Sequence, residues 1–171
     1  MYIASEMIKN QVYSILIENW DEEVTGVFVA EGREWILLYD NQNDFILEGF
    51  RFIHKSKLDV VLREEDELFK EKIFAKKYPS FFVDKTYNLD DSQALLNQIM
   101  IEKKLLHFDT DNEEEIIVGL IEQVLPEKFK IKSLTSEAIW SDTCYCSFSE
   151  LSTIAIDNDY LKSLNLVVEG R

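Results

Sequence analysis

SKLDVVLREEDEL (residues 56–68) and SELSTIAIDNDYL (residues 149–161) are stretches of equal length that decide how this chain folds. They lie roughly ninety residues apart, and a unit that recurs only twice at such a spacing indicates a duplicated domain, because a solenoid needs three or more units. In each stretch an aliphatic strand leads into an acidic helical start. Four positions are identical: Ser56/Ser149, Leu58/Leu151, Asp66/Asp159 and Leu68/Leu161.

The first half contains five short segments rich in β-branched and aromatic residues, separated by polar turn clusters. Gly49 stands inside the fourth segment, where it indicates a bulge or a bend. Five short strands with close turns are typical of a small barrel or sandwich. The predicted strands are residues 11–18, 25–30, 34–40, 45–53 and 58–62.

The periodicity then changes to that of helices. Residues 63–77 form the first predicted helix, because Leu62, just before it, and Phe69 and Ile73 recur at the spacing of one helical face. Residues 90–104 form the second predicted helix, with an N-cap at Asp90 or Asp91. Residues 158–164 form one closing helical turn.

The second half repeats the first in outline. Strands are predicted at 105–110, 116–125 and 129–134, followed by short strands between 138 and 156. Two pairs of segments look alike: ILIEN (15–19) with GLIEQ (119–123), and WILLYD (35–40) with FKIKSL (129–134). If these pairs are equivalent, the distance between the two segments is about ten residues shorter in the second half than in the first. The sequence therefore predicts a mainly β protein with two or three helices, built from module 1–89 and module 90–171.

The formal net charge of −15 is shared by both halves. A field of that sign repels a phosphate backbone and favours a basic partner. The N-terminus does not resemble a signal peptide, and no apolar run reaches the ~18 residues of a membrane span. Cys144 and Cys146 lie two apart on one predicted strand, where neighbours rarely form a disulfide, so reduced thiols in a cytoplasmic protein are expected.

No pattern in the chain predicts an enzyme, a metal site or a cofactor. His54 and His107 have no neighbouring nucleophile in a known catalytic motif. The acidic run at 109–115 lacks the glycine and the glutamate that a calcium loop needs, so a solvated hairpin tip is expected there. Two cysteines without paired histidines do not make a zinc site.

Two binding hypotheses follow. The first is a scaffold or immunity-like protein that engages a basic protein partner through exposed tryptophans and acids, for which the candidates are Trp20, Trp140, Glu113, Glu114 and Glu115. The alternative is an RNA-binding module that uses the lysine clusters at 51–57 and 70–77, for which the candidates are Arg51, Lys55, Lys57, Lys70 and Lys72.

Residues 26–61 resemble a family of uncharacterised bacterial proteins built from two tandem Sm-like or SH3-like small β-barrels. The shared pattern comprises a strand around Trp35, an Asp44–Phe45 turn and a Gly49–Phe50 pair, and the segment 118–164 is similar to their second half. Glu48 stands where Asp or Asn is expected. The resemblance implies two packed barrels and carries no functional residue.

Overall fold

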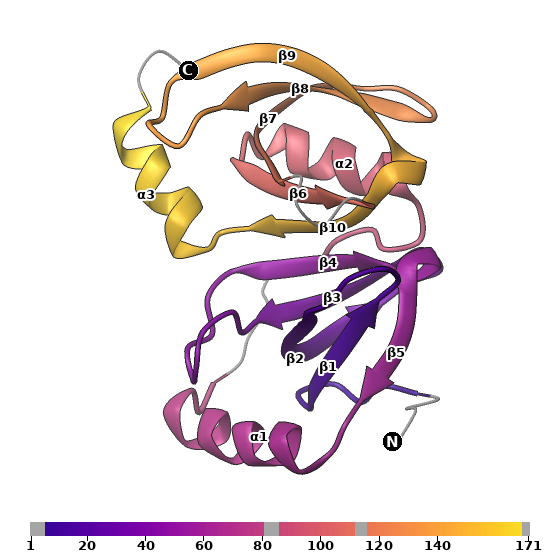
Figure 1. The fold of residues 1–171 in the computed structure, drawn as a ribbon, viewed down its shortest axis with the longest axis vertical. Helices are drawn as coiled ribbons and strands as arrows, with labels where there is room; N and C mark the ends of the chain where they lie inside the picture. Colours follow the sequence, from indigo (N-terminus) through magenta and orange to yellow (C-terminus); the bar gives the residue numbers. More distant parts are fainter. Residues whose placement is uncertain (1–5, 81–85, 112–115, 169–171) are drawn as a thin grey trace.

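The computed structural model describes residues 6–80, 86–111 and 116–168. Within these residues, ten strands form a single continuous antiparallel sheet, and three α-helices accompany it. The predicted mainly β fold is thereby confirmed. The sheet order is β5-β1-β2-β3-β4-β10-β6-β7-β8-β9. Figure 1 shows the two halves stacked end to end, with β4 beside β10 where they meet.

The strands divide equally between the halves. The first half contributes β1 (Val12–Ile17), β2 (Glu23–Glu31), β3 (Trp35–Asp40), β4 (Phe50–His54) and β5 (Leu58–Leu62). The second half contributes β6 (Leu106–Thr110), β7 (Ile116–Val124), β8 (Lys128–Leu134), β9 (Trp140–Ser147) and β10 (Leu151–Ile156).

The pairing registers show that the halves are copies with a constant offset of 93 residues. Tyr13 pairs with Gly26 in the first half, and Leu106 pairs with Gly119 in the second. The β2–β3 pairing slips between Phe28 and Ala30, and the β7–β8 pairing slips at the equivalent place, between Ile121 and Gln123. The short 3₁₀ turns after β4 and β9 begin at Lys55 and Phe148, again 93 residues apart.

The structure corrects the predicted alignment between the halves. GLIEQ (119–123) lies in β7, the counterpart of β2, whereas ILIEN (15–19) begins in β1. The predicted match of WILLYD with FKIKSL is shifted by one residue, because Trp35 corresponds to Lys128 and not to Phe129. The chain between the first strand and the third strand is therefore equally long in both halves, and the predicted shortening in the second half is wrong. A short aliphatic run fits several strands equally well, so local similarity could not fix the register.

Gly26 and Gly119 are equivalent positions at which the backbones of neighbouring strands approach closely. A Cβ atom would lie 2.5 Å from the Tyr39 carbonyl oxygen at Gly26 and 2.1 Å from the Lys132 carbonyl oxygen at Gly119. Both glycines stand next to the matched bulges, which increase the local bend of a sheet. Gly49 has a φ of +68° and ends the loop before β4, so the predicted bend is present but the strand begins only at Phe50.

The predicted helices are present with small changes in their ends. They are α1 (Glu65–Lys77), α2 (Ser92–Ile101) and α3 (Asp159–Val167), of which α2 is capped by Asp91 and α3 by Asn158. The predicted apolar face of α1 is wrong at Phe69, which is exposed, whereas Glu67 and Phe74 are buried. Glu67 can be buried because its carboxylate accepts hydrogen bonds from Ser14 Oγ and the Glu64 amide.

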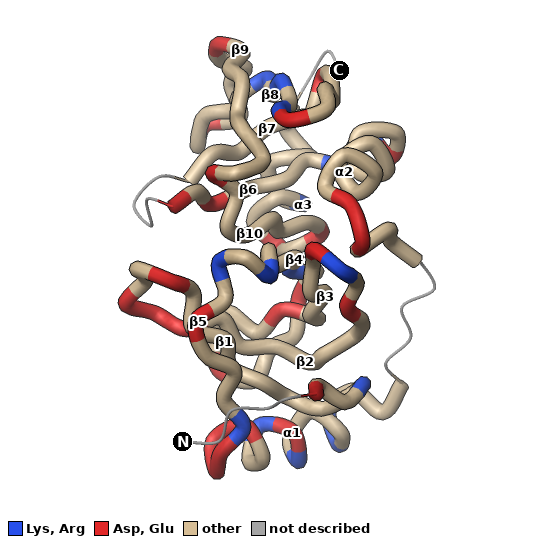
Figure 2. The backbone as a smooth tube through the Cα atoms, turned by 90° about the vertical axis from the view of Figure 1, so that its right-hand side faces the viewer, with Lys and Arg blue, Asp and Glu red and all other residues tan. Residues whose placement is uncertain are grey.

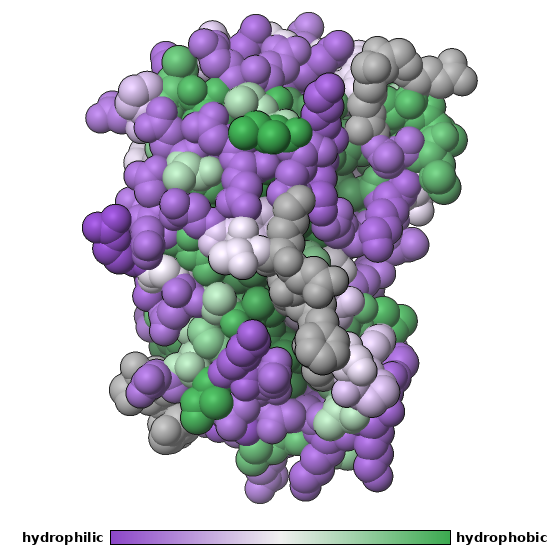
Figure 3. Space-filling model, turned by 180° about the vertical axis from the view of Figure 1, so that it is seen from behind, coloured by the Kyte–Doolittle hydropathy of each residue, from purple (hydrophilic) through white to green (hydrophobic). Residues whose placement is uncertain are grey.

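The largest hydrophobic cluster draws residues from both halves. Trp35, Leu37 and Phe52 of the first half pack in one cluster with Phe108 and Ile154 of the second. α2 adds leucines and an isoleucine to the cluster, and the Trp35 indole donates a hydrogen bond to Ser92 Oγ at the start of this helix. Seen from behind, the surface is mostly hydrophilic with separate hydrophobic patches (Figure 3). The two halves therefore share one sheet and one main core.

Candidate binding site at the junction of the two halves

A cavity of about 390 Å³ opens beside the junction of the halves, and we call it the junction pocket. The start of β2 and the loop after β3 form one side, and β6 and β7 contribute the other. Its lining residues are Trp20, Glu22, Glu23, Val24, Thr25, Asp40, Asn41, Gln42, Asn43, Arg51, His107, Asp109 and Ile116.

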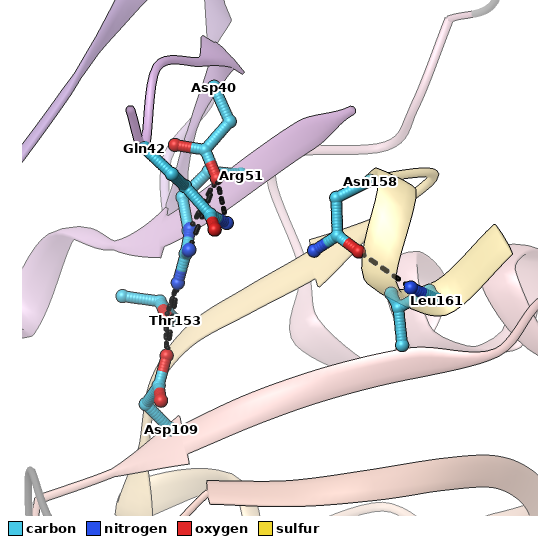
Figure 4. A network of polar contacts seen from close by, with 7 residues as sticks. All are labelled: Asp40, Gln42, Arg51, Asp109, Thr153, Asn158 and Leu161. Carbon is cyan, nitrogen blue, oxygen red and sulfur yellow. Dashed lines mark hydrogen bonds and ion pairs between the residues drawn. The ribbon is translucent and has the colours of Figure 1, made fainter. Parts of the chain in front are cut away.

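Arg51 of β4 lies at the centre of a polar network against this pocket (Figure 4). Its guanidinium contacts Asp40 Oδ2 at 3.1 Å and Asp109 Oδ2 at 3.1 Å, and it donates to Thr153 Oγ1 at 3.0 Å. Thr153 Oγ1 in turn donates to Asp109 Oδ2 at 2.5 Å. Arg51 is only 8% exposed. The network therefore joins both halves through charged groups that cannot be separated without leaving one of them buried and unpaired.

Burial also sets the protonation of the ionisable groups beside Arg51. Desolvation, with a contribution from the Arg51 charge, lowers the pKa of His107 to about 3. Burial raises the pKa of Asp109, an effect that Arg51 and Thr153 partly oppose. His107 is consequently neutral near pH 7, so the pocket gains no positive charge from it.

The pocket wall holds two buried polar atoms that have no hydrogen-bond partner among the described residues. Asn41 is 6% exposed, and its amide nitrogen donates to the carbonyl oxygens of Asn43, Asp44 and Ile46, which leaves its Oδ1 without a donor. The second atom is Nε1 of the half-buried Trp20. An unsatisfied buried polar group costs about 1–3 kcal/mol, so these two atoms lower the stability of the fold.

The mouth of the pocket is acidic. Glu22 and Glu23 are exposed at the start of β2. A neighbouring cavity of about 400 Å³ shares this rim and adds Asp21, Asp44 and Lys70. Acids outnumber bases in both cavities, and Figure 2 shows acidic residues distributed over both halves. The region presents a negative field to an approaching ligand.

The structure separates the two predicted tryptophans. Trp20 lies in the junction pocket, whereas Trp140 is half-buried beside α3, with Lys132 Nζ 5.0 Å from its ring centroid. Glu113, Glu114 and Glu115 lie outside the described residues. One predicted partner-binding residue therefore belongs to the site.

The predicted RNA-binding residues do not form one surface. Arg51 is buried between two carboxylates. Lys55 Nζ lies 2.6 Å from Glu31, and Lys57 Nζ lies 2.5 Å from Asp111. Lys70 and Lys72 stand on α1, away from β4.

The two histidines have different surroundings. His54 Nδ1 accepts a hydrogen bond from the Ser56 amide and caps the 3₁₀ turn, and its ring packs on Trp35 at 4.8 Å. His107 is half-buried and lines the junction pocket.

Sequence reasoning did not identify Asp40, Asn41 or Thr153 as site residues. The turn cluster that follows β3 indicated a loop at Asn41, but nothing in the local pattern showed that its side chain folds back inside.

Comparison of the chain with protein-family models, curated proteins and solved structures finds no match in any of the three. Across residues 6–80, 86–111 and 116–168, no group of three or more His, Cys, Asp or Glu side chains is arranged to hold a metal ion. In the same residues, no helix has the length and apolar character needed to cross a membrane.

Proposed function

We propose that this protein is a non-enzymatic cytoplasmic binding or scaffold protein that takes a cationic side chain of a basic protein partner into the junction pocket. Its two halves would act as Sm-like or SH3-like barrel modules that hold the pocket between them. The observation that carries the proposal is the acidic rim of the pocket, where the exposed carboxylates of Glu22 and Glu23 stand at the mouth of a cavity of about 390 Å³.

The chemistry of the wall favours a lysine or arginine side chain. Both are donors without acceptors, and hydrogen bonds from a charged donor are the strong ones. The Glu22 and Glu23 carboxylates supply acceptors, while neutral His107 does not repel a cation. Arg51 can neutralise only one of its two carboxylates, Asp40 and Asp109, when both are ionised.

An immunity-like role, in which the protein neutralises a basic toxin, is one form of this proposal. The net charge of −15 would steer a basic protein toward the pocket and raise the association rate. Such steering weakens with salt, because exposed charges are screened.

The test compares two variants that lose equal charge. Glu22→Gln with Glu23→Gln removes two acids from the pocket rim, and Glu65→Gln with Asp66→Asn removes two exposed acids from α1. An arginine-rich peptide serves as the probe, and its affinity is measured by calorimetry. We expect the rim variant to bind about tenfold more weakly and the control to change little, since ~1.4 kcal/mol corresponds to a factor of ten. Equal losses in the two variants would contradict a localised site.

RNA binding is measured in the same series with a random single-stranded RNA pool. Tight binding at low salt with a steep logarithmic salt slope would favour the RNA alternative over the protein partner. The ion pairs at Arg51, Lys55 and Lys57 support the opposite expectation, because those charges are already neutralised.

A further inference from the structure

The two ends of the sheet are counterparts of the two strands that join the halves. β4 pairs with β10 at the junction, while β5 and β9 are the end strands. By the offset of 93 residues, β5 corresponds to β10 and β9 to β4. We propose that β9 of one copy pairs antiparallel with β5 of a second copy, in the geometry by which β4 pairs with β10 inside one chain.

The internal pairing gives the register of this contact. Within the chain, Ile53 pairs with Thr153, Phe52 with Ile154 and Arg51 with Ala155. The equivalent contact between copies places Cys146 opposite Val60, Tyr145 opposite Val61 and Cys144 opposite Leu62.

The side chains at the two free edges are both less polar than their counterparts at the junction. At the junction, Arg51 of β4 meets Thr153 and Asp109 of the second half. The counterparts of these three residues are Cys144 on one edge and Val60 and Leu16 on the other. Each of these counterparts is less polar than the junction residue it corresponds to. Pairing of the two edges would therefore bury no unpaired charge at these positions, which would be costly. Less polar residues stand on both edges together, as a shared interface requires.

Residues of the two end strands are more exposed than the equivalent residues at the junction. All six residues of β10 are buried, whereas Val61 alone is buried in β5. Phe52 at the junction is 0% exposed, but its counterpart Tyr145 is 56% exposed. An uncovered edge strand with apolar side chains is a template for pairing with another chain.

A contact of this kind is head-to-tail, so each copy retains one free edge after pairing. Further copies add until the assembly closes into a ring or continues as a fibre. The proposal does not rest on the junction pocket, whose lining includes neither Tyr145 nor Val60.

The first test is the mass of the full chain in solution, measured by light scattering and sedimentation over a concentration series. We expect at least a twofold increase over the monomer mass. Tyr145→Glu and Val60→Glu, at opposite ends of the sheet, should each restore the monomer, while Tyr160→Glu, an exposed position on α3, should not. Thermal melts verify that each variant is folded. A wild-type chain that stays monomeric at its highest soluble concentration overturns the proposal and leaves the edges to a strand from a different protein.

The second test examines the register. Chains carrying Thr143→Cys are mixed with chains carrying Arg63→Cys, because Thr143 and Arg63 are the counterparts of the paired residues Phe50 and Ile156. We expect oxidation to give a disulfide-linked heterodimer. Lys72→Cys on α1 replaces Arg63→Cys as the control and should give none. Equal cross-linking in both mixtures would contradict this register, whatever the mass measurement shows.

Discussion

Arg51 of β4 and Asp109 of β6 form a buried ion pair of 3.1 Å between residues 58 positions apart in the chain. The pair crosses from one copy of the repeated unit to the other, and Thr153 of β10 bonds to both partners. The junction is therefore held by specific charged contacts as well as by the strand pairing and the shared core.

Replacing Arg51 with alanine should destabilise the fold by about 3–5 kcal/mol, because Asp40 and Asp109 would be left buried without a cation. The free energy of unfolding in urea measures the loss. Arg33→Ala is the control, since the Arg33–Asp90 pair is exposed and such pairs contribute at most about 1 kcal/mol. A loss at Arg51 no larger than that at Arg33 would show that the network does not hold the junction.

Stability should fall as the pH falls from about 6.5 toward 3, on account of His107. The folded-state pKa of His107 is lowered from 6.5 to about 3, so over this range the unfolded chain binds a proton that the folded chain excludes. The loss is on the order of 3–5 kcal/mol. The raised pKa of Asp109 acts in the opposite direction, because its folded carboxyl binds a proton more readily than the unfolded one.

His107→Gln should flatten this dependence. The measurement is a series of urea titrations from pH 7 to acidic pH for the wild type and the variant. Identical pH profiles for the two proteins would show that His107 is not the group responsible.

Gly119→Ala and Gly26→Ala should each destabilise the protein, by roughly 1–3 kcal/mol, because the new methyl group meets a neighbouring backbone carbonyl that belongs to the sheet. Thermal unfolding measures the effect. Gln123→Ala, an exposed change in the same strand as Gly119, is the matched control. Unchanged melting at both glycines would mean that the strands can separate without cost.

Asn158→Ala should cost about 1 kcal/mol through the loss of the cap of α3. Asn158 is buried, and its Oδ1 accepts a hydrogen bond from the Leu161 amide at 2.9 Å. Asn158→Asp keeps the acceptor and should retain more of the stability than alanine, as measured in the same urea titration. An alanine variant as stable as the wild type would show that the cap is replaced by solvent.

The sequence allowed the repeated pattern, the strands, the helices and the cap of α2 to be predicted, because these follow from short-range patterns. The pairs Leu58/Leu151 and Asp66/Asp159 are separated by 93 residues, and Gly26 and Gly119 have the same separation. The register of the remaining strands depends on how β2 and β7 bend at those glycines. The hydrophobic pattern alone does not predict that bend, so it could not give the register.

Of the predicted partner-binding residues, Trp20 lines the candidate site, and of the predicted RNA-binding residues, Arg51 does. Arg51 belongs to a lysine-containing run and its pattern indicates an exposed base, since nothing nearby marks Asp40 or Asp109 as its partners. Asn41 was missed for a related reason. Its turn is visible in the sequence, but the inward direction of its side chain depends on three carbonyl groups that only the folded loop brings together.

The unbroken offset between the halves also bears on their ancestry. A forebear consisting of one such unit would have carried a β4-type rim and a β5-type rim on the same small molecule, free to meet those of its siblings. Fusion of two such units would turn one of these contacts into the β4–β10 pairing within a single chain, where Arg51 and Asp109 now form a buried ion pair.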